Sequence, residues 1–122
     1  MCGVFLSSTN DKSAQSQVLV ALKTLEYRGY DSYGIFSVHG GKNGYDLQRF
    51  VGHVDHKKLK KIETNFAFGH TRWATHGGVV DANAHPHVSN NKKFVLVHNG
   101  ILENFAVLKE ALSGKGYKFS SA

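Results

Sequence analysis

The sequence contains only one cysteine and one proline, and it has no long run of apolar residues. One cysteine cannot form a disulfide within the chain, so the fold must be stable without one. No apolar run is long enough to cross a bilayer, and residues 1–12 lack the basic and then apolar segments of a signal peptide. We therefore expect a cytoplasmic protein that has no membrane partner.

The chain is basic, with a formal net charge of +6 over 122 residues. This charge raises the hypothesis of a nucleic-acid-binding protein, which salt-dependent binding to duplex DNA would test. Much of the excess, however, lies in the run HKKLKK at residues 56–61. On a helix over residues 55–63, Leu59 and Ile62 would face inward and the lysines would be solvated. No aromatic residue interleaves the run and no binding motif accompanies it, so we expect no nucleic-acid partner.

The pattern of apolar residues predicts one domain in which helices and strands are mixed. Strands are expected over residues 2–7, 33–38, 45–51, 66–70 and 94–98, with a further strand beginning at 117–119, and helices over residues 13–27, 55–63 and 102–114. Gly40, Gly41, Asn43 and Gly44 provide the turn of a hairpin between the second and third strands. Residues 71–91 have little periodicity, and a loop of this length in a compact domain is usually functional or disordered.

Cys2 directly follows the initiator methionine. A residue this small at position 2 generally permits removal of Met1, which would leave a thiol and a free α-amine on the same residue. An α-amine titrates near ~7.7–8.0, so it can accept the thiol proton at neutral pH without a separate histidine. Many proteins begin with Met-Cys by chance, so the position is a weak signal until other segments support it.

Two further segments carry groups suited to binding an amino-acid substrate. Residues 69–77, GHTRWATHG, bring an arginine, an indole, hydroxyls and histidines to the point where a strand becomes a loop. Arg72 could clamp a carboxylate through paired hydrogen bonds while Trp73 closes over it. Asn99 and Gly100 supply a side-chain amide and a backbone N–H, two donors suited to an oxyanion hole. Taken singly, Arg72 could be a surface residue, Trp73 a packing residue and Asn99-Gly100 a turn.

Five segments occur together, in order, across nearly the entire chain. They are Met1-Cys-Gly3, LEYRGYDS at 25–32, GHTRWATHG at 69–77, NAHPH at 83–87 and HNG at 98–100. Together they resemble the glutaminase domain, a class II glutamine amidotransferase, of the glutamine–fructose-6-phosphate transaminase family. The resemblance implies an α+β fold, the αββα sandwich of N-terminal-nucleophile (Ntn) hydrolases, of which residues 1–122 would be the N-terminal part.

The resemblance also implies a catalytic role for four residues in the hydrolysis of L-glutamine. Cys2 would attack the side-chain amide and form a glutamyl thioester, with its own α-amine as general base. Asn99 and the N–H of Gly100 would hold the oxyanion. Arg28 would have a supporting, orienting role near the nucleophile.

The same resemblance implies that one loop binds the substrate. Arg72 would pair with the α-carboxylate of glutamine, and Trp73, Thr75 and His76 would lie in the segment that closes over it. In complete relatives, sugar-isomerase domains receive the ammonia and make glucosamine 6-phosphate from fructose 6-phosphate. We expect this chain to form a homo-oligomer or to pair with such domains.

Two features depart from the family pattern. Tyr33 replaces the small residue that usually follows YRGYDS, which is expected to alter packing more than chemistry. In the family, the segment matching residues 117–122 continues into an aspartate that binds the α-amino group of glutamine, and this sequence stops before that aspartate. An alternative function is therefore a non-catalytic module that acts by self-association or by pairing with a full-length synthase.

Five histidines raise the alternative of a zinc site: His70, His76, His85, His87 and His98. Their spacing fits no common structural zinc site, and no CxxC motif, HExxH motif or second cysteine accompanies them. We therefore expect neither a metal nor an organic cofactor.

Overall fold

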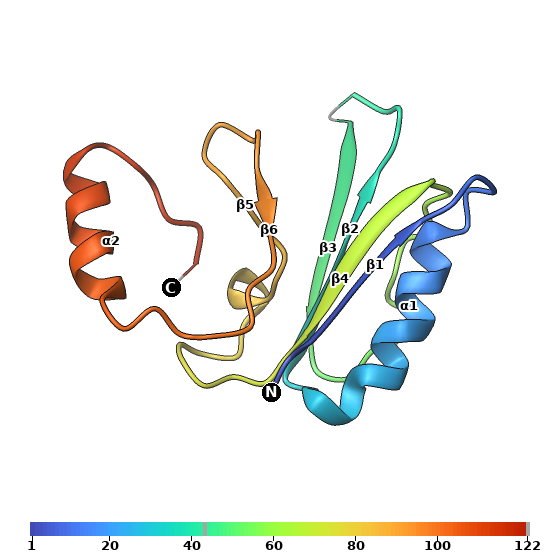
Figure 1. Ribbon diagram of the computed structural model, residues 1–122, viewed down its shortest axis with the longest axis horizontal. Coiled ribbons are helices and arrows are strands. Elements are labelled where there is room, and N and C mark those ends of the chain that lie inside the picture. The colour runs from blue at the N-terminus through green and yellow to red at the C-terminus, as the bar shows by residue number, and fades with distance from the viewer. Residues whose placement is uncertain (43, 122) are drawn as a thin grey trace.

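A computed structural model describes residues 1–42 and 44–121 of the chain (Figure 1). The helices and strands, in chain order, are β1 (Gly3–Ser8), α1 (Ala14–Thr24), the 3-10 helix η1 (Leu25–Arg28), β2 (Ser32–Val38), β3 (Tyr45–Val51), β4 (Phe66–Arg72), the 3-10 helix η2 (Asp81–Asn83), β5 (His87–Val88), β6 (Val95–Leu96) and α2 (Phe105–Gly114). The first four predicted strands, the first helix and the antiparallel hairpin of β2 and β3 are confirmed. Asn43, expected in the hairpin turn, lies outside the described residues. No helix within the described part is both long and apolar enough to span a bilayer.

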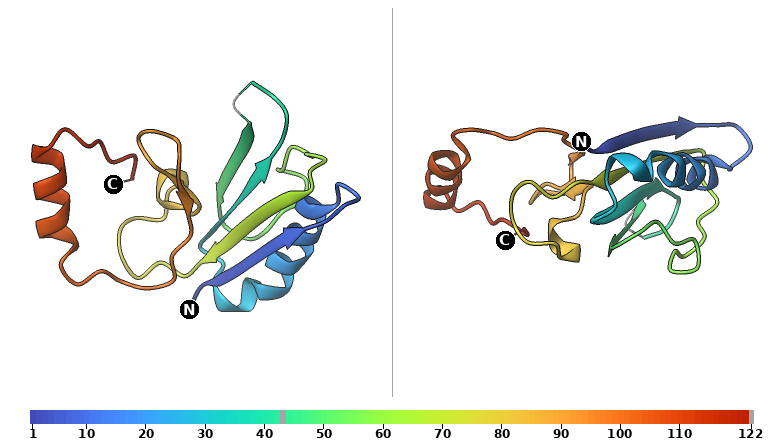
Figure 2. Two further views of the ribbon diagram at one scale, coloured as in Figure 1. Left: turned by 45° about the horizontal axis from the view of Figure 1, so that its top comes forward. Right: turned by 90° about the horizontal axis from the view of Figure 1, so that it is seen from below.

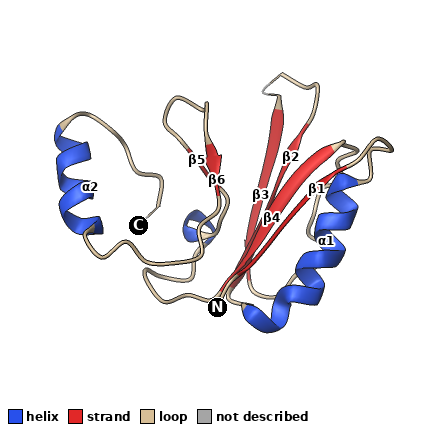
Figure 3. Ribbon diagram, viewed as in Figure 1, coloured by secondary structure: helices blue, strands red, loops and turns tan. Residues whose placement is uncertain are grey.

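Four of the strands form one antiparallel sheet in the order β1-β4-β2-β3 (Figure 3). β4 is an inner strand, with Gly3 of β1 paired to Thr71 and Ser32 of β2 paired to Arg72. Because antiparallel neighbours run in opposite directions, the beginning of β1 and the beginning of β2 both lie beside the end of β4. The residues that precede β1 and β2 therefore meet those that follow β4.

Helix α1 covers one face of the sheet (Figures 1 and 2). Ala14, Val18 and Leu22 recur every four residues and so lie on one side of the helix, where all three are completely buried. They belong to the same hydrophobic core as Ile35 and Ala67 of the sheet. The apolar spacing along α1 thus accounts for the way the helix binds to the sheet.

Replacing Gly69 with alanine is expected to destabilise the fold by about 1–3 kcal/mol, the usual cost of overpacking a core. The new methyl carbon would lie 2.7 Å from Leu22 Cδ1, 2.9 Å from Val18 Cγ1 and 2.8 Å from the Gly34 carbonyl oxygen. Urea unfolding measures the loss. Gly114→Ala is the control, because a methyl group there meets no atom within 4 Å. An unchanged unfolding midpoint for Gly69→Ala would contradict this close packing.

The opposite face of the sheet is covered in part by β5, β6 and the loops around them (Figure 2). On this face the rings of Phe36 and Phe68 lie with centroids 5.2 Å apart, and Phe36 is buried. On the edge strand β1, however, Val4 and Leu6 are 46% and 54% exposed. Apolar side chains therefore extend beyond the area that β5 and β6 cover.

The helix predicted over residues 55–63 is absent, so this prediction is wrong; the segment forms a turn followed by irregular chain. The side-chain amide of Gln48 binds both backbone groups of Lys60, at 2.7 Å from the N–H and 2.8 Å from the oxygen. Gln15 Oε1 accepts the N–H of Ile62 at 2.7 Å. These side chains satisfy backbone groups that a helix would otherwise pair internally. Leu59 packs against the core, as predicted.

The strand predicted over residues 94–98 is limited to two residues, Val95–Leu96, and it is not buried. Phe94 and Leu96 are 67% and 54% exposed. In the described structure, β6 pairs with β5 alone, as a two-stranded sheet. No described layer covers the side chains of Phe94 and Leu96, so the predicted burial of this strand is wrong.

The last predicted helix and strand also require correction. Helix α2 begins at Phe105 rather than at residue 102, and none of its residues is buried. It lies farther from the four-stranded sheet than β5 and β6 do (Figure 1). Residues 117–121 contain no strand. Instead, the Lys118 N–H and carbonyl oxygen bind the side chain of Asn90, at 2.8 and 2.7 Å.

Candidate active site

The turn between η1 and β2 fixes the path of the chain as it leaves β4. At Gly29 a methyl carbon would lie 2.7 Å from Trp73 N, so the two backbones are in direct contact and only glycine fits. The Asp31 N–H donates to the Arg72 carbonyl oxygen at 3.1 Å, and Asp31 Oδ2 accepts the Ala74 N–H at 2.7 Å. The YRGYD segment therefore holds the RWA segment in position.

Cys2 lies against this exit from β4. The Trp73 N–H donates to Cys2 Sγ at 3.4 Å, and the sulfur lies 4.0 Å from the Trp73 carbonyl oxygen. The Gly3 N–H donates to Thr71 Oγ1 at 3.1 Å, which anchors the start of β1. A backbone N–H directed at sulfur is suited to a thiol that becomes negatively charged during a reaction.

Arg28 and Asn99 both contact the backbone of Cys2. Arg28 Nε donates to the Cys2 carbonyl oxygen at 3.5 Å, and Asn99 Nδ2 donates to the same oxygen at 3.4 Å. Asn99 Oδ1 accepts the Cys2 N–H at 3.4 Å. All three distances exceed the usual ~2.9–3.0 Å for an N–H···O bond. These contacts are therefore weak, and the Asn99 amide can exchange them for a substrate at little cost.

The side chain of Arg72 is buried, and the residue is only 8% exposed. Its guanidinium donates to the Gly78 carbonyl oxygen at 3.0 Å and to the carbonyl oxygen of His76. Asn83 Nδ2 donates to the same Gly78 oxygen at 2.9 Å. The guanidinium thus holds residues 72–78 in a compact loop, and Arg72 lines the same cavity as Cys2.

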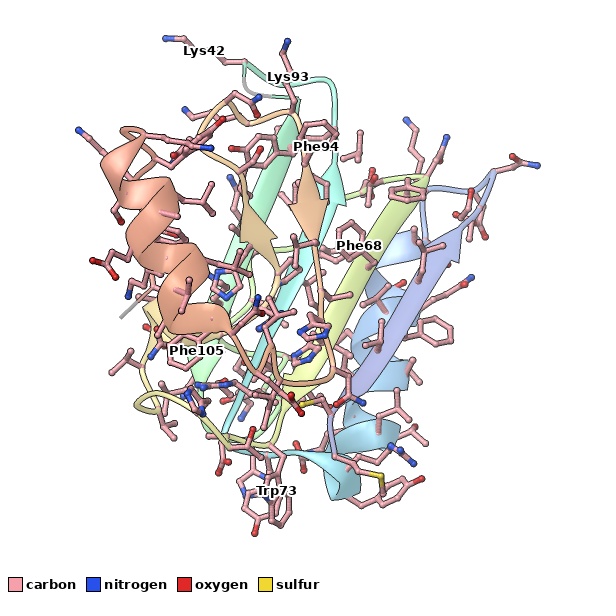
Figure 4. All side chains as sticks on the ribbon, turned by 60° about the vertical axis from the view of Figure 1, so that its left-hand side comes forward. Lys42, Phe68, Trp73, Lys93, Phe94 and Phe105 are labelled. Carbon is pink, nitrogen blue, oxygen red and sulfur yellow. The ribbon has the colours of Figure 1, made fainter. Side chains whose placement is uncertain are left out.

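Trp73 contacts the ring of Tyr30, which is itself stacked on a second ring. Its ring is edge-on to Tyr30 with centroids 5.7 Å apart, and Tyr30 stacks on His53 at 5.2 Å. Trp73 remains 43% exposed. Figure 4 shows it at one end of the molecule, opposite Lys42 and Lys93. A half-exposed, laterally supported indole is suited to covering a bound ligand.

A cavity of about 330 Å³ adjoins Cys2. Seven of the eight residues predicted for the site line it, namely Cys2, Arg72, Trp73, Thr75, His76, Asn99 and Gly100. The eighth, Arg28, is not part of the lining and reaches the Cys2 carbonyl oxygen instead. The structure therefore brings all eight together, while their chemical roles stay predictions.

The site prediction missed three histidines that also line this cavity, His70, His85 and His98. It also assigned no role to Asp31, which holds Ala74. All four residues lie within the motifs GHTRWATHG, NAHPH, HNG and YRGYDS, but their spacing gave no reason for a role. Across residues 1–42 and 44–121, no three His, Cys, Asp or Glu side chains are grouped to hold a metal ion.

Burial favours the neutral form of two of these histidines. Loss of water contact, aided by nearby positive charge, lowers the pKa of His70 from 6.5 to about 4 and that of His85 from 6.5 to about 3. The two rings stack with centroids 4.5 Å apart. Neither ring nitrogen of His70 has a hydrogen-bond partner of good geometry among the described residues, although the His98 backbone is near enough to oppose part of the pKa shift.

Acidification is expected to destabilise the fold through these histidines. Between pH 6.5 and about 4 the unfolded chain binds a proton at position 70 that the folded chain does not. The contribution of His70 to stability is therefore complete above pH 6.5. Below it, the free energy of unfolding falls by up to about 1.4 kcal/mol per pH unit. The lowered pKa of His85 acts in the same direction over this pH range and adds to the loss.

Urea unfolding from neutral pH down to about pH 5 measures this slope. His70→Leu is the matched variant, since leucine fills the space without a titrating group, and it is expected to flatten the slope. Equal slopes for the parent and His70→Leu would contradict the assignment to His70.

Comparison with solved structures gives the class of fold. The chain matches a structure described as the allosteric regulatory enzyme of purine biosynthesis, with a TM-score of 0.78 and 26% identity over 98% of this chain and 26% of that chain. It matches glutamine phosphoribosylpyrophosphate amidotransferase from B. subtilis with a TM-score of 0.74 and 27% identity, over 98% of this chain and 26% of that chain. The fold is that of the Ntn-hydrolase amidotransferases, which confirms the predicted class.

Comparison of sequences gives the family. Residues 47–122 match the sequence model of a protein family that is described as the glutamine amidotransferase domain. The chain is 46%, 44% and 42% identical, over 99% of its length, to the glutamine–fructose-6-phosphate aminotransferases of Thermococcus kodakarensis, Corynebacterium glutamicum and Sulfurisphaera tokodaii. It spans 20–21% of the length of these three relatives. The chain belongs to the glutamine amidotransferase domain family, and it matches the glutaminase domain of these aminotransferases.

Proposed function

We propose that this chain hydrolyses L-glutamine to L-glutamate and ammonia through a thioester at Cys2. The observation that carries the proposal is the shared cavity, which Cys2, Arg72, Asn99 and Gly100 line although they come from three distant parts of the sequence. Membership of the glutamine amidotransferase domain family supports glutamine as the substrate. In this proposal residues 1–122 belong to a single domain of that family.

In the proposed reaction the free α-amine of Cys2 accepts the thiol proton, and Sγ attacks the side-chain carbonyl carbon of glutamine. Asn99 Nδ2 and the Gly100 N–H donate to the resulting oxyanion. The carbon–nitrogen bond breaks, the α-ammonium returns its proton to the leaving nitrogen, and ammonia departs. Water, deprotonated by the same amine, then attacks the glutamyl thioester. The carbon–sulfur bond breaks, Sγ takes the proton back from the α-ammonium, and glutamate departs.

The remaining site residues would hold the nucleophile and the substrate in place. Arg28 orients the Cys2 carbonyl group through its Nε–H, and the Trp73 N–H orients the sulfur. The charge of Arg72 attracts the α-carboxylate of glutamine, while its bonds to the carbonyl groups of residues 76 and 78 keep the loop closed. Trp73, Thr75 and His76 cover the substrate and exclude water from the thioester until ammonia has left.

The proposal requires a free Cys2 α-amine, whereas an attached Met1 makes that nitrogen part of a peptide bond. Protein from which Met1 has been removed is expected to release glutamate, and protein that retains Met1 is not. Mass spectrometry defines the state of each sample, and an assay for glutamate measures turnover. Equal turnover in both samples would exclude the amine as the base. Absence of turnover from protein lacking Met1 would favour the alternative function, a non-catalytic module.

The names of the relatives support a proposal for the wider role of the chain. They are named glutamine–fructose-6-phosphate aminotransferases, and this chain covers about a fifth of their length. We propose that the ammonia is used for glucosamine 6-phosphate synthesis, by sugar-isomerase domains with which the chain pairs. A reducing cytoplasm is the compartment that suits this proposal, because it maintains the Cys2 thiol.

We also propose that the chain forms a homo-oligomer through the open face of its sheet. The exposed apolar side chains of Val4 and Leu6 on edge strand β1 support such a contact, since association would remove them from water. Sedimentation of the parent chain is expected to show a dimer or larger species, and Leu6→Lys is expected to shift it to the monomer. The matched control is Val20→Lys, on α1 and 68% exposed. A monomeric parent chain would contradict the proposal.

A further inference from the structure

The segment that carries Asn99 and Gly100 is held by a histidine rather than by a strand. β5 and β6 pair only at His87 with Leu96 and at Val88 with Val95. Extending this register by two residues would set His85 opposite His98. The residue between His85 and β5 is Pro86, which has no N–H to donate to a strand ladder. Backbone pairing therefore ends before it reaches the proposed oxyanion hole.

The side chain of His85 replaces the missing backbone partner. The His98 N–H donates to His85 Nδ1 with a nitrogen–nitrogen distance of 3.1 Å. His98 directly precedes Asn99, so this bond restrains the backbone that carries the proposed oxyanion donors. The next contacts along the segment are those of the Asn99 side chain with Cys2, and these are longer, at 3.4 Å.

His85 is itself fixed against the rigid sheet. Its ring stacks on His70, which belongs to β4 and is completely buried, with centroids 4.5 Å and planes 23° apart. Its carbonyl oxygen lies over Gly34 of β2, so closely that a methyl carbon there would come within 2.2 Å. On the other side, the His87 ring is 4.5 Å away and steeply inclined, at 68°. The position of Nδ1 is thus set by two strands of the main sheet.

The hydrogen bond also defines the protonation of His85. Nδ1 can accept the His98 N–H only if it carries no proton, so the ring must be neutral with its proton on Nε2. Burial lowers the pKa of His85 to about 3, with the charge of Arg72 and of neighbouring histidines, when they are protonated, acting in the same direction; a neutral ring at pH 7 is consistent with this value.

We propose that His85 is a positioning residue for the oxyanion hole, which uses neutral Nδ1 to hold the His98-Asn99-Gly100 backbone at a fixed distance from Cys2. This inference rests on the proposed function, because the oxyanion hole is part of that proposal. The inference adds His85 to the proposed site as a residue that affects the reaction only by holding the backbone of residues 98–100. A loss of positioning should lower kcat and leave KM nearly unchanged, since the oxyanion exists only along the reaction path.

Two variants with the same functional group separate positioning from general packing. In His85→Asn the amide oxygen can occupy the place of Nδ1, whereas in His85→Gln the amide reaches toward the place of Nε2. We expect His85→Asn to retain kcat within about fivefold, and His85→Gln to lose about a hundredfold, the usual effect of misplacing a reacting group by an ångström. His87→Gln, on the adjacent ring, is the control and is expected to stay close to the parent. Equal losses for the Asn and Gln variants, or a loss expressed in KM, would overturn the proposal.

Amide hydrogen exchange tests the bond independently of turnover. The His98 N–H is expected to exchange slowly in the parent and in His85→Asn, and quickly in His85→Gln. Unchanged protection of His98 in folded His85→Gln would overturn the positioning role, even if the chain hydrolyses glutamine. Conversely, a parent chain without turnover would refute the proposed function, and the exchange rates would still decide whether His85 holds this segment.

Discussion

Replacing Cys2 with alanine is expected to abolish glutamate release, with a fall in kcat of at least about a thousandfold, because the variant has no atom that can form the thioester. The cavity beside Cys2 and the Trp73 N–H directed at its sulfur would remain. Glutamine binding should therefore survive the change. Isothermal titration with glutamine and an assay for glutamate measure the two properties separately. The Met1-free form must be used for both proteins.

Ser8→Ala is a matched control for this variant, since Ser8 is an exposed residue at the far end of the same strand. It is expected to keep the parent kcat. Residual turnover in Cys2→Ala near that of the parent would refute a cysteine mechanism. Because Cys2 is the only cysteine in the chain, no other thiol could substitute for it.

Replacing Asn99 with alanine is expected to lower kcat by about a hundredfold to a thousandfold, the effect of removing one oxyanion donor. KM should change little, because the amide meets its charged partner only as the oxyanion forms. Steady-state kinetics with glutamine measure both constants. Asn99→Asp is expected to be at least as slow, since a carboxylate has a similar shape but no N–H and would repel the oxyanion.

The control for this pair is Asn10→Ala, an exposed asparagine in the loop after β1. It should leave kcat and KM unchanged. A raised KM with unchanged kcat in Asn99→Ala would move Asn99 from the oxyanion hole to ground-state binding of glutamine. Thermal unfolding of each variant distinguishes a kinetic effect from loss of the weak contacts between Asn99 and the Cys2 backbone.

The local spacing of apolar residues and glycines was sufficient to predict helix α1 and the β2–β3 hairpin of the main sheet. The four-residue spacing of Ala14, Val18 and Leu22 predicts a helix with one buried side, and the structure buries that side completely. The glycines between β2 and β3 predict a hairpin, which the antiparallel pairing confirms. In both cases the deciding interactions are close in sequence, so the sequence pattern contains them.

The local spacing of apolar residues gave wrong predictions where side chains distant in sequence determine the backbone conformation. The spacing of Leu59 and Ile62 is helical, but Gln48 and Gln15 bind the backbone of residues 60 and 62 in an irregular segment. The apolar run from Phe94 has the composition of a buried strand, yet Phe94 and Leu96 remain more than half exposed. Hydrophobic periodicity indicates which side of a helix or strand is suited to burial. Whether another element packs on that side depends on the whole fold.

The sequence by itself determined the chemical groups of the candidate site and the family, because the motifs around Cys2, Arg72 and Asn99 are contiguous runs of residues. Only the tertiary structure decided how these groups meet. Antiparallel pairing of β1 with β4 brings Cys2 to within reach of the Trp73 N–H, 71 residues away. A ring stacked on β4 supplies the hydrogen bond that holds the residue before Asn99. Contacts of this kind depend on strand register and on side chains from separate segments that pack together. Neither property can be read from a single motif.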